Sequence, residues 1–192
     1  MVRHEGMDRR QQLLRRLDKA WRAFKESFAR LTEPELLDPG VTGAWSVRDI
    51  IAHVTTWEEE ALKHLPLVLT GEKPPRYSTM YGGIDAFNAR ETERQRSLSL
   101  AEVLRQSDVV HERLVDFVAN VAEDQLGGET RFRHRLRLDT YAHYPKHAEA
   151  IRKWRGGVPV RPSPGRPHGR PDERELKSSR DRAALQELWC RP

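Results

Sequence analysis

The chain has 192 residues, of which 37% are hydrophobic and 33% charged, with a net charge of +5 and an isoelectric point near 9.6. This length suffices for one domain with a buried core and a tail, and is short for two domains. No apolar run approaches the roughly 18 residues of a membrane span, the first residues lack the apolar stretch of a secretion signal, and the single cysteine, Cys190, excludes an internal disulfide. We therefore expect a cytoplasmic protein with no membrane partner.

The positive charge is concentrated at the C-terminal end. Residues 157–192 carry +3 of the net charge of +5, which leaves +2 for residues 1–156. In that larger part, basic and acidic residues alternate as they do on ordinary helix surfaces. Because nucleic-acid-binding domains usually gather basic residues on one face, we do not expect the folded part to bind nucleic acid. A basic tail that acts as an interaction arm is the weakest of the alternatives.

The hydrophobic pattern predicts an all-α protein, and its first half contains two long helices. The first helix is expected over about residues 8–31, where apolar residues recur three or four apart: Leu14, Leu17, Trp21, Phe24, Phe28 and Leu31. The segment 32–35 has the spacing of a capping box and predicts a short helical turn. The second long helix begins after an N-cap at Ser46 and continues toward Leu69, with Pro66 expected to kink its end.

The second half contains the other two long helices. Residues 71–83 are expected to form a loop and residues 84–95 a short helix, after which the third long helix begins at Ser99 and ends before Gly127. Apolar residues alternate with arginines over 130–137, which favours a short extended link. The fourth helix is expected over about residues 139–155, with Pro145 inside it as a bend.

The composition changes after this fourth helix. Residues 158–171 include five prolines and show no apolar periodicity, as is typical of a disordered linker. Residues 172–189 have only a weak helical pattern. We therefore divide the chain into a four-helix bundle over residues 1–156 and a Pro/Arg-rich linker and tail over residues 157–192, which is disordered or a lone short helix.

Three histidines are the main candidates for chemistry. His53 lies among apolar residues of the second long helix, and His143 and His147 are spaced to share one face of the fourth. Two antiparallel helices would bring the three imidazoles together as ligands of a divalent cation, with coordination positions left open. A single pair at this spacing is a weak signal, so satisfied core or boundary histidines remain the alternative.

Other residues near these histidines have simpler interpretations. Glu60 falls on the same helical face as His53 and could be a fourth ligand or orient an imidazole, although a glutamate there is more often solvated. Packing is the favoured role for Tyr141 and Tyr144, and the tryptophans are expected to anchor the core. The remaining candidates, Cys190 in the tail and three histidines in polar surroundings, offer no recognisable chemistry: His64, His111 and His134.

Three parts of the sequence together resemble the DinB/YfiT-like superfamily over roughly residues 8–156. They are the run from Trp45 to His53 with Trp57 and Glu58, the segment 84–88, and the run from His143 to Trp154. The ClbS/DfsB-type proteins look closest. The resemblance implies a DinB-like four-helix bundle with a divalent metal, whether nickel, zinc, iron or manganese, held at the positions of His53, His143 and His147. It also implies that a homodimer is possible.

What the resemblance implies about activity is broader. Some relatives are thiol-dependent transferases or isomerases, and others are hydrolases or resistance proteins that act on reactive compounds. The leading hypothesis is therefore a metal-dependent enzyme, a thiol-dependent transferase or a hydrolase, that acts on a small electrophilic molecule or binds a thiol. Its pocket walls would include Trp57, Tyr144 and the loop of residues 71–83. The alternative is a non-catalytic bundle of the same family that binds or sequesters a small-molecule ligand.

Overall fold

The computed structural model describes residues 3–157, and this part of the chain is helical with no β-strand; Thr42 and Trp45 form one isolated bridge. The nine helices within it are α1 Arg3–Phe28, α2 Glu33–Leu37, α3 Val47–Leu69, α4 Tyr77–Tyr81, α5 Ile84–Arg94, α6 Leu100–Ala119, α7 Glu123–Leu126, α8 Arg131–Asp139 and α9 Tyr144–Gly156. None of these helices is both long enough and apolar enough to cross a membrane. The predicted all-α fold is confirmed.

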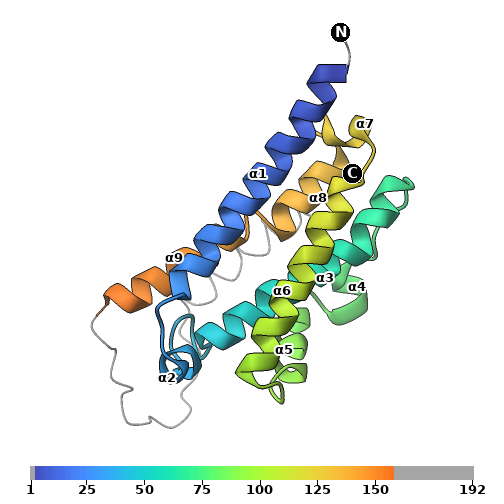
Figure 1. The fold of residues 1–192 in the computed structure, drawn as a ribbon. Helices are drawn as coiled ribbons and strands as arrows, with labels where there is room; N and C mark the ends of the chain where they lie inside the picture. The colour runs from blue at the N-terminus through green and yellow to red at the C-terminus, as the bar shows by residue number, and fades with distance from the viewer. Residues whose placement is uncertain (1–2, 158–192) are drawn as a thin grey trace.

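The long helices pack in pairs. Figure 1 shows α9 alongside the C-terminal half of α1, and α6 crossing α3, while α8 continues the path of α9 and packs on α3. The short helices α4 and α5 contact each other, and α5 also packs on α3. A bundle of four long helices is thus formed, with its fourth member divided into α8 and α9.

The helix starts agree with the polar residues that precede them. The Ser46 hydroxyl accepts a hydrogen bond from the Asp49 main-chain N–H at 3.2 Å, and Asp49 Oδ2 accepts one from the Ser46 N–H at 3.0 Å. At α6, Ser99 accepts from the Glu102 N–H at 3.2 Å. Such caps satisfy main-chain donors that a helix leaves unpaired at its N-terminus, so the sequence locates these two starts correctly.

The core consists of two adjoining apolar clusters. The first joins α1, α3 and α9 and includes Leu17, Trp21, Phe24, Phe28, Ile50, Ile51, Tyr144 and Ile151. The second joins α3, α6, α7 and α8 and includes Leu65, Leu114, Val118, Leu126, Phe132 and Leu136. Each α1 residue in the first cluster belongs to the periodic set that predicted this helix. Burial of that stripe is the main force that orients α1.

The predicted extended link over 130–137 is wrong, because these residues form α8. Thr130 caps the helix by accepting from the Arg133 N–H at 3.2 Å. Phe132 and Leu136, four residues apart, are both fully buried in the core. Their spacing fits one helix face as well as the alternation of a strand, and contacts with α3 decide in favour of the helix.

The predicted continuous fourth helix with an internal bend is also wrong. The chain leaves α8 at Asp139, makes a turn over residues 140–143 and starts α9 at Tyr144, with Pro145 in the first turn. Proline has no N–H and its ring collides with the carbonyl four residues earlier, so a helix through this position is disfavoured, whereas the first turn of a helix tolerates it. Pro145 therefore marks a helix start.

Two further predictions concern the segment 71–83 and the end of α3. The loop predicted over residues 71–83 contains the short helix α4, which packs on α5. Pro66 lies inside α3, which continues to Leu69. The predictions for the tail, including Cys190, concern residues 158–192 and fall outside the described part of the chain.

Candidate metal centre

The three predicted histidines lie together where the start of α9 meets α3. His53 is on α3, two turns after the Ser46 cap, and His143 directly precedes α9, which contributes His147. The His53 and His143 Nε2 atoms are 3.2 Å apart, and those of His143 and His147 are 2.9 Å apart. One ring nitrogen from each histidine lies within 4.8 Å of the others. The sequence thus predicts correctly which side chains meet.

The turn before α9 makes this convergence possible. Main-chain N–H groups of His143 and Tyr144 both donate to the Thr140 carbonyl, at 2.7 and 2.9 Å, and the Lys146 N–H donates to the His143 carbonyl at 3.1 Å. His143 keeps helical backbone angles although it precedes the helix. It therefore retains the spacing that places residues four apart on the same face.

Burial keeps these imidazoles neutral. It lowers the pKa of His53 to about 3, with the neighbouring His147 as a second cause. Burial also lowers the pKa of His147 to about 4, with a smaller effect from the charge of Lys146. The pKa of His143 is lowered well below its usual value, again mainly by burial. At neutral pH all three rings therefore have a free nitrogen lone pair.

Two tryptophans flank the cluster. The Trp45 ring lies 4.9 Å from the His53 ring, and the Trp57 ring lies 6.3 Å from His53 and 6.1 Å from His143, measured between centroids. Trp57 Nε1 donates to Asn88 Oδ1 at 3.2 Å, which fixes the indole against α5. Trp57 therefore lies beside the histidine cluster, with its indole held on the side of α5.

Two of the three spacings between the ring nitrogens fit a metal ion. Ligand nitrogens at about 2.1 Å from one cation lie about 3.0 Å apart in octahedral and about 3.4 Å apart in tetrahedral geometry. The two Nε2 separations, 3.2 and 2.9 Å, are close to these values. Neutral imidazoles are preferred ligands of zinc, nickel and iron, and three of them leave positions open for a further ligand.

The comparison with family models agrees with this geometry. Residues 16–155 match the model of the DinB superfamily, a span that covers most of the chain and includes all three histidines. The chain belongs to the DinB superfamily. No curated protein and no solved structure matched it in the corresponding searches.

Glu60 does not join the histidines in this DinB-superfamily chain. The residue is 3% exposed, and its carboxylate accepts hydrogen bonds from the Tyr77 hydroxyl and the Lys63 ammonium, each at 2.6 Å. It is therefore neither a ligand nor a solvated glutamate. The spacing of the two residues places Glu60 and His53 on one helical face, but Tyr77 of α4 lies close enough to bind the carboxylate.

Glu60 belongs to a second polar cluster, between α3, α4 and α8. Arg135 donates to Asp139 Oδ2 at 2.5 Å and contacts His64 Nδ1 at 3.0 Å and the Tyr77 hydroxyl at 3.3 Å. Burial raises the pKa of Asp139 to about 7, although Arg135 opposes this shift. The prediction that His64 is isolated is thus wrong, because its partners come from elements distant in sequence.

A third polar group lies in the core and was missed from the sequence. Glu58 is fully buried and accepts hydrogen bonds from the Tyr144 hydroxyl and from His111 Nδ1, the latter at 2.7 Å. The Trp21 ring stacks on His111 at 3.9 Å and 8°. Tyr144 therefore faces the core and is not a wall of the histidine site, and His111 is not isolated.

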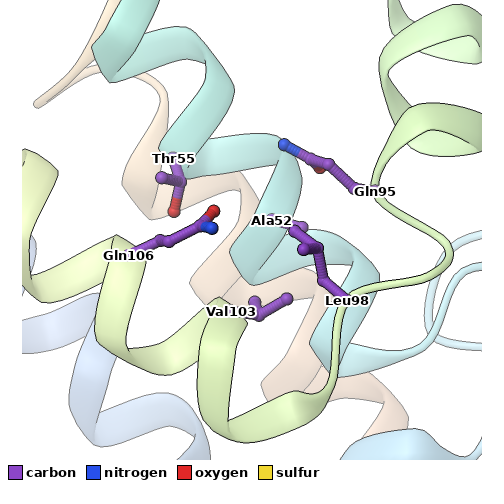
Figure 2. Close-up of a pocket in the computed structure, with 6 residues that line it drawn as sticks. All are labelled: Ala52, Thr55, Gln95, Leu98, Val103 and Gln106. Carbon is purple, nitrogen blue, oxygen red and sulfur yellow. The ribbon is translucent and has the colours of Figure 1, made fainter.

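A separate crevice lies between α3 and α6. Figure 2 shows its lining, which comes from the two helices and from the connection that precedes α6: Ala52, Thr55, Gln95, Leu98, Val103 and Gln106. The crevice has essentially no free space for even a water molecule. Small-molecule sites usually measure about 300–1,000 Å³, so this crevice is too small to be one.

Proposed function

We propose that this chain binds one divalent metal ion through the Nε2 atoms of His53, His143 and His147 and uses it to act on a small electrophilic molecule. The observation that carries the proposal is the convergence of three neutral imidazoles, one buried and two half-buried, with Nε2 of His143 3.2 Å from that of His53 and 2.9 Å from that of His147. Nickel, zinc, iron and manganese all suit imidazole ligands to some degree, and the donor set does not choose among them.

Three protein ligands support a catalytic role, because they leave coordination positions open. A divalent cation held by three protein groups acidifies a thiol or water at an open position and polarises an electrophile. The resemblance to ClbS/DfsB-type proteins supports a thiol-dependent transferase or a hydrolase. In the transferase reaction a new bond from sulfur to carbon replaces the bond to the leaving group, and the thiol proton passes to solvent.

The protein's own residues have separate tasks in this proposal. His53 on α3 and the His143–His147 pair at the start of α9 would hold the cation. Trp45 and Trp57 cover the imidazoles with apolar surface, which limits access of water and strengthens electrostatic interactions at the site. The indole of Trp57 would contact a small apolar substrate.

Activity can be tested with simple probes. The zinc- or nickel-loaded chain is mixed with cysteine and monobromobimane to measure transfer, and with p-nitrophenyl acetate to measure hydrolysis. We expect turnover in at least one assay, with loss in excess chelator and in His143→Ala. A metal-loaded chain that is silent in both assays, or a chelator-insensitive rate, would contradict the catalytic part of the proposal and favour a ligand-binding module.

A further inference from the structure

The buried carboxylate of Glu58 connects the four long segments of the bundle. Glu58 lies on α3, its partners Tyr144 and His111 lie on α9 and α6, and Trp21 on α1 stacks against His111. Each of these four residues is less than 9% exposed. A carboxylate is rarely buried so deeply without function or full pairing, and here Oε2 has no hydrogen-bond partner among the described residues.

The position of this group relative to the histidines is informative. Glu58 follows His53 by five residues on the same helix, which corresponds to a rise of about 7.5 Å and a rotation of about 140°. Tyr144 directly follows His143. The bond from the Tyr144 hydroxyl to Glu58 therefore joins, within the core, the two segments that carry the histidines.

The break before α9 leaves the position of its start to contacts with other parts of the fold. Because α8 and α9 are separate helices, no continuous helical backbone fixes the direction of α9 relative to α8. Pro145 also lacks the N–H that would continue the hydrogen-bond ladder. The start of α9 must therefore be held by the turn of residues 140–143 and by side chains that reach other helices. Tyr144 is fully buried and reaches α3 at this point.

We propose that Glu58 and Tyr144 are positioning residues of the metal centre: their hydrogen bond holds the start of α9 against α3, with His143 and His147 at ligand distance from His53. This inference rests on the metal-binding function proposed above. His111 supports the same carboxylate from α6. Neither residue contacts the metal, and both act through the helices that carry the ligands.

The most direct test removes only the hydroxyl of Tyr144. Titration of the metal-free full chain with Co²⁺, followed by visible absorption, gives the Kd and reports ligand geometry. We expect Tyr144→Phe to bind about tenfold more weakly, with an altered spectrum, as is usual when groups that orient metal ligands are lost. Tyr141→Phe, which removes a hydroxyl three residues earlier on a half-buried ring, is the matched control and should match wild type.

A second pair of variants keeps the inference testable if Tyr144→Phe does not fold. Glu58→Gln retains an oxygen that accepts from Tyr144 and should bind Co²⁺ nearly as wild type does. Glu58→Met has similar volume without an acceptor and should bind about tenfold more weakly. Folding of each variant is checked by circular dichroism at the temperature of the titration, so that weaker binding is not confused with unfolding.

The outcomes separate this inference from the function on which it rests. If wild type binds no Co²⁺, the metal-binding function fails. If wild type binds Co²⁺ but Tyr144→Phe or Glu58→Met binds with the same Kd and spectrum, the positioning role fails while the metal site stands. A loss of thermal stability with unchanged Co²⁺ binding would show that the Glu58 bond is purely structural.

Discussion

At the histidine cluster, the environment of each ring determines its protonation. Desolvation favours the neutral imidazole, and each ring also lies beside other groups that can be positively charged. A site built in this way is ready for a cation without first releasing protons at neutral pH. The same burial has a measurable cost in acid, because the unfolded chain can take up protons that the folded chain excludes.

The metal-free chain should therefore lose stability as the pH falls. The pKa values of His53, His64 and His147 are lowered by burial to about 3, 4 and 4, from 6.5 in the unfolded chain. Between about pH 6.5 and 4 the unfolded state binds more protons at each of them, so each lowers the unfolding free energy by up to about 1.4 kcal/mol per pH unit. Asp139, whose pKa is raised to about 7, has the opposite effect on stability. Below that pH the folded chain binds one more proton at Asp139 than the unfolded chain does, which adds stability as the pH falls.

Urea unfolding at several pH values in excess chelator measures this slope. In His147→Asn, the slope of unfolding free energy against pH between pH 6 and pH 4 should be smaller than in wild type by an amount that corresponds to nearly one proton. Above pH 7.5, the difference in stability between the variant and wild type should stay constant. An identical slope in both proteins would mean that His147 is protonated equally in the folded and unfolded states.

At the scale of the helices, α3 contributes a residue to each of the three polar clusters: His53, Glu58 and Glu60. The position of its start therefore affects all three clusters. Its first turn is fixed by the reciprocal bonds between Ser46 and Asp49. Nearby, Arg48 donates to the carbonyls of Gln95 and Leu98, both at 2.5 Å, and so joins α3 to the segment that precedes α6. These contacts give α3 a defined position in the bundle.

Replacement of Ser46 by alanine should lower the unfolding free energy by about 1–2 kcal/mol, because a main-chain N–H in the first turn loses its acceptor. Chemical denaturation of the metal-free chain measures the effect. Ser97→Ala, at an exposed position between α5 and α6, is the control and should change stability by less than about 0.5 kcal/mol. Equal stabilities of the two variants would show that the Ser46 cap contributes nothing.

The helix starts were largely predictable from the sequence, whereas the break before α9 was not. Ser46 and Ser99 indicate the starts of α3 and α6 because a capping hydrogen bond involves only residues close in sequence. The pattern of Phe132 and Leu136 is compatible with both an extended link and a helix, and only burial against α3 decides. Pro145 predicts an irregular point in the helical backbone, but whether it bends a helix or begins one depends on the packing of α9 against α1.

For the whole molecule, the candidate site was predictable to the extent that its residues lie in recognisable local patterns. His53, His143 and His147 could be chosen by spacing and by family resemblance. The partners of Glu58 could not, because His111 is 53 residues away and Tyr144 is 86 residues away. Such contacts arise from the packing of helices, and no local pattern predicts them.

A metal that joins α3 to α9 should also stabilise the whole fold. A ligand that binds only the native state at a hundredfold excess over its Kd adds about 2.7 kcal/mol, or a rise in Tm of about 5–10 °C for a domain of this size. Thermal unfolding with and without Zn²⁺ measures this. We expect the rise in wild type and its absence in His53→Ala, and an equal rise in both proteins would place the metal elsewhere.

The central claim is that His53, His143 and His147 form one metal site, and the stoichiometry of metal binding tests it most directly. The full chain without an affinity tag is dialysed against Zn²⁺ and then buffer, and its metal content is measured by mass spectrometry. We predict one ion per wild-type chain and per chain of His134→Ala, a control at an exposed histidine on α8, and close to none for His143→Ala. Equal metal content in all three proteins, or none in wild type, would contradict the account.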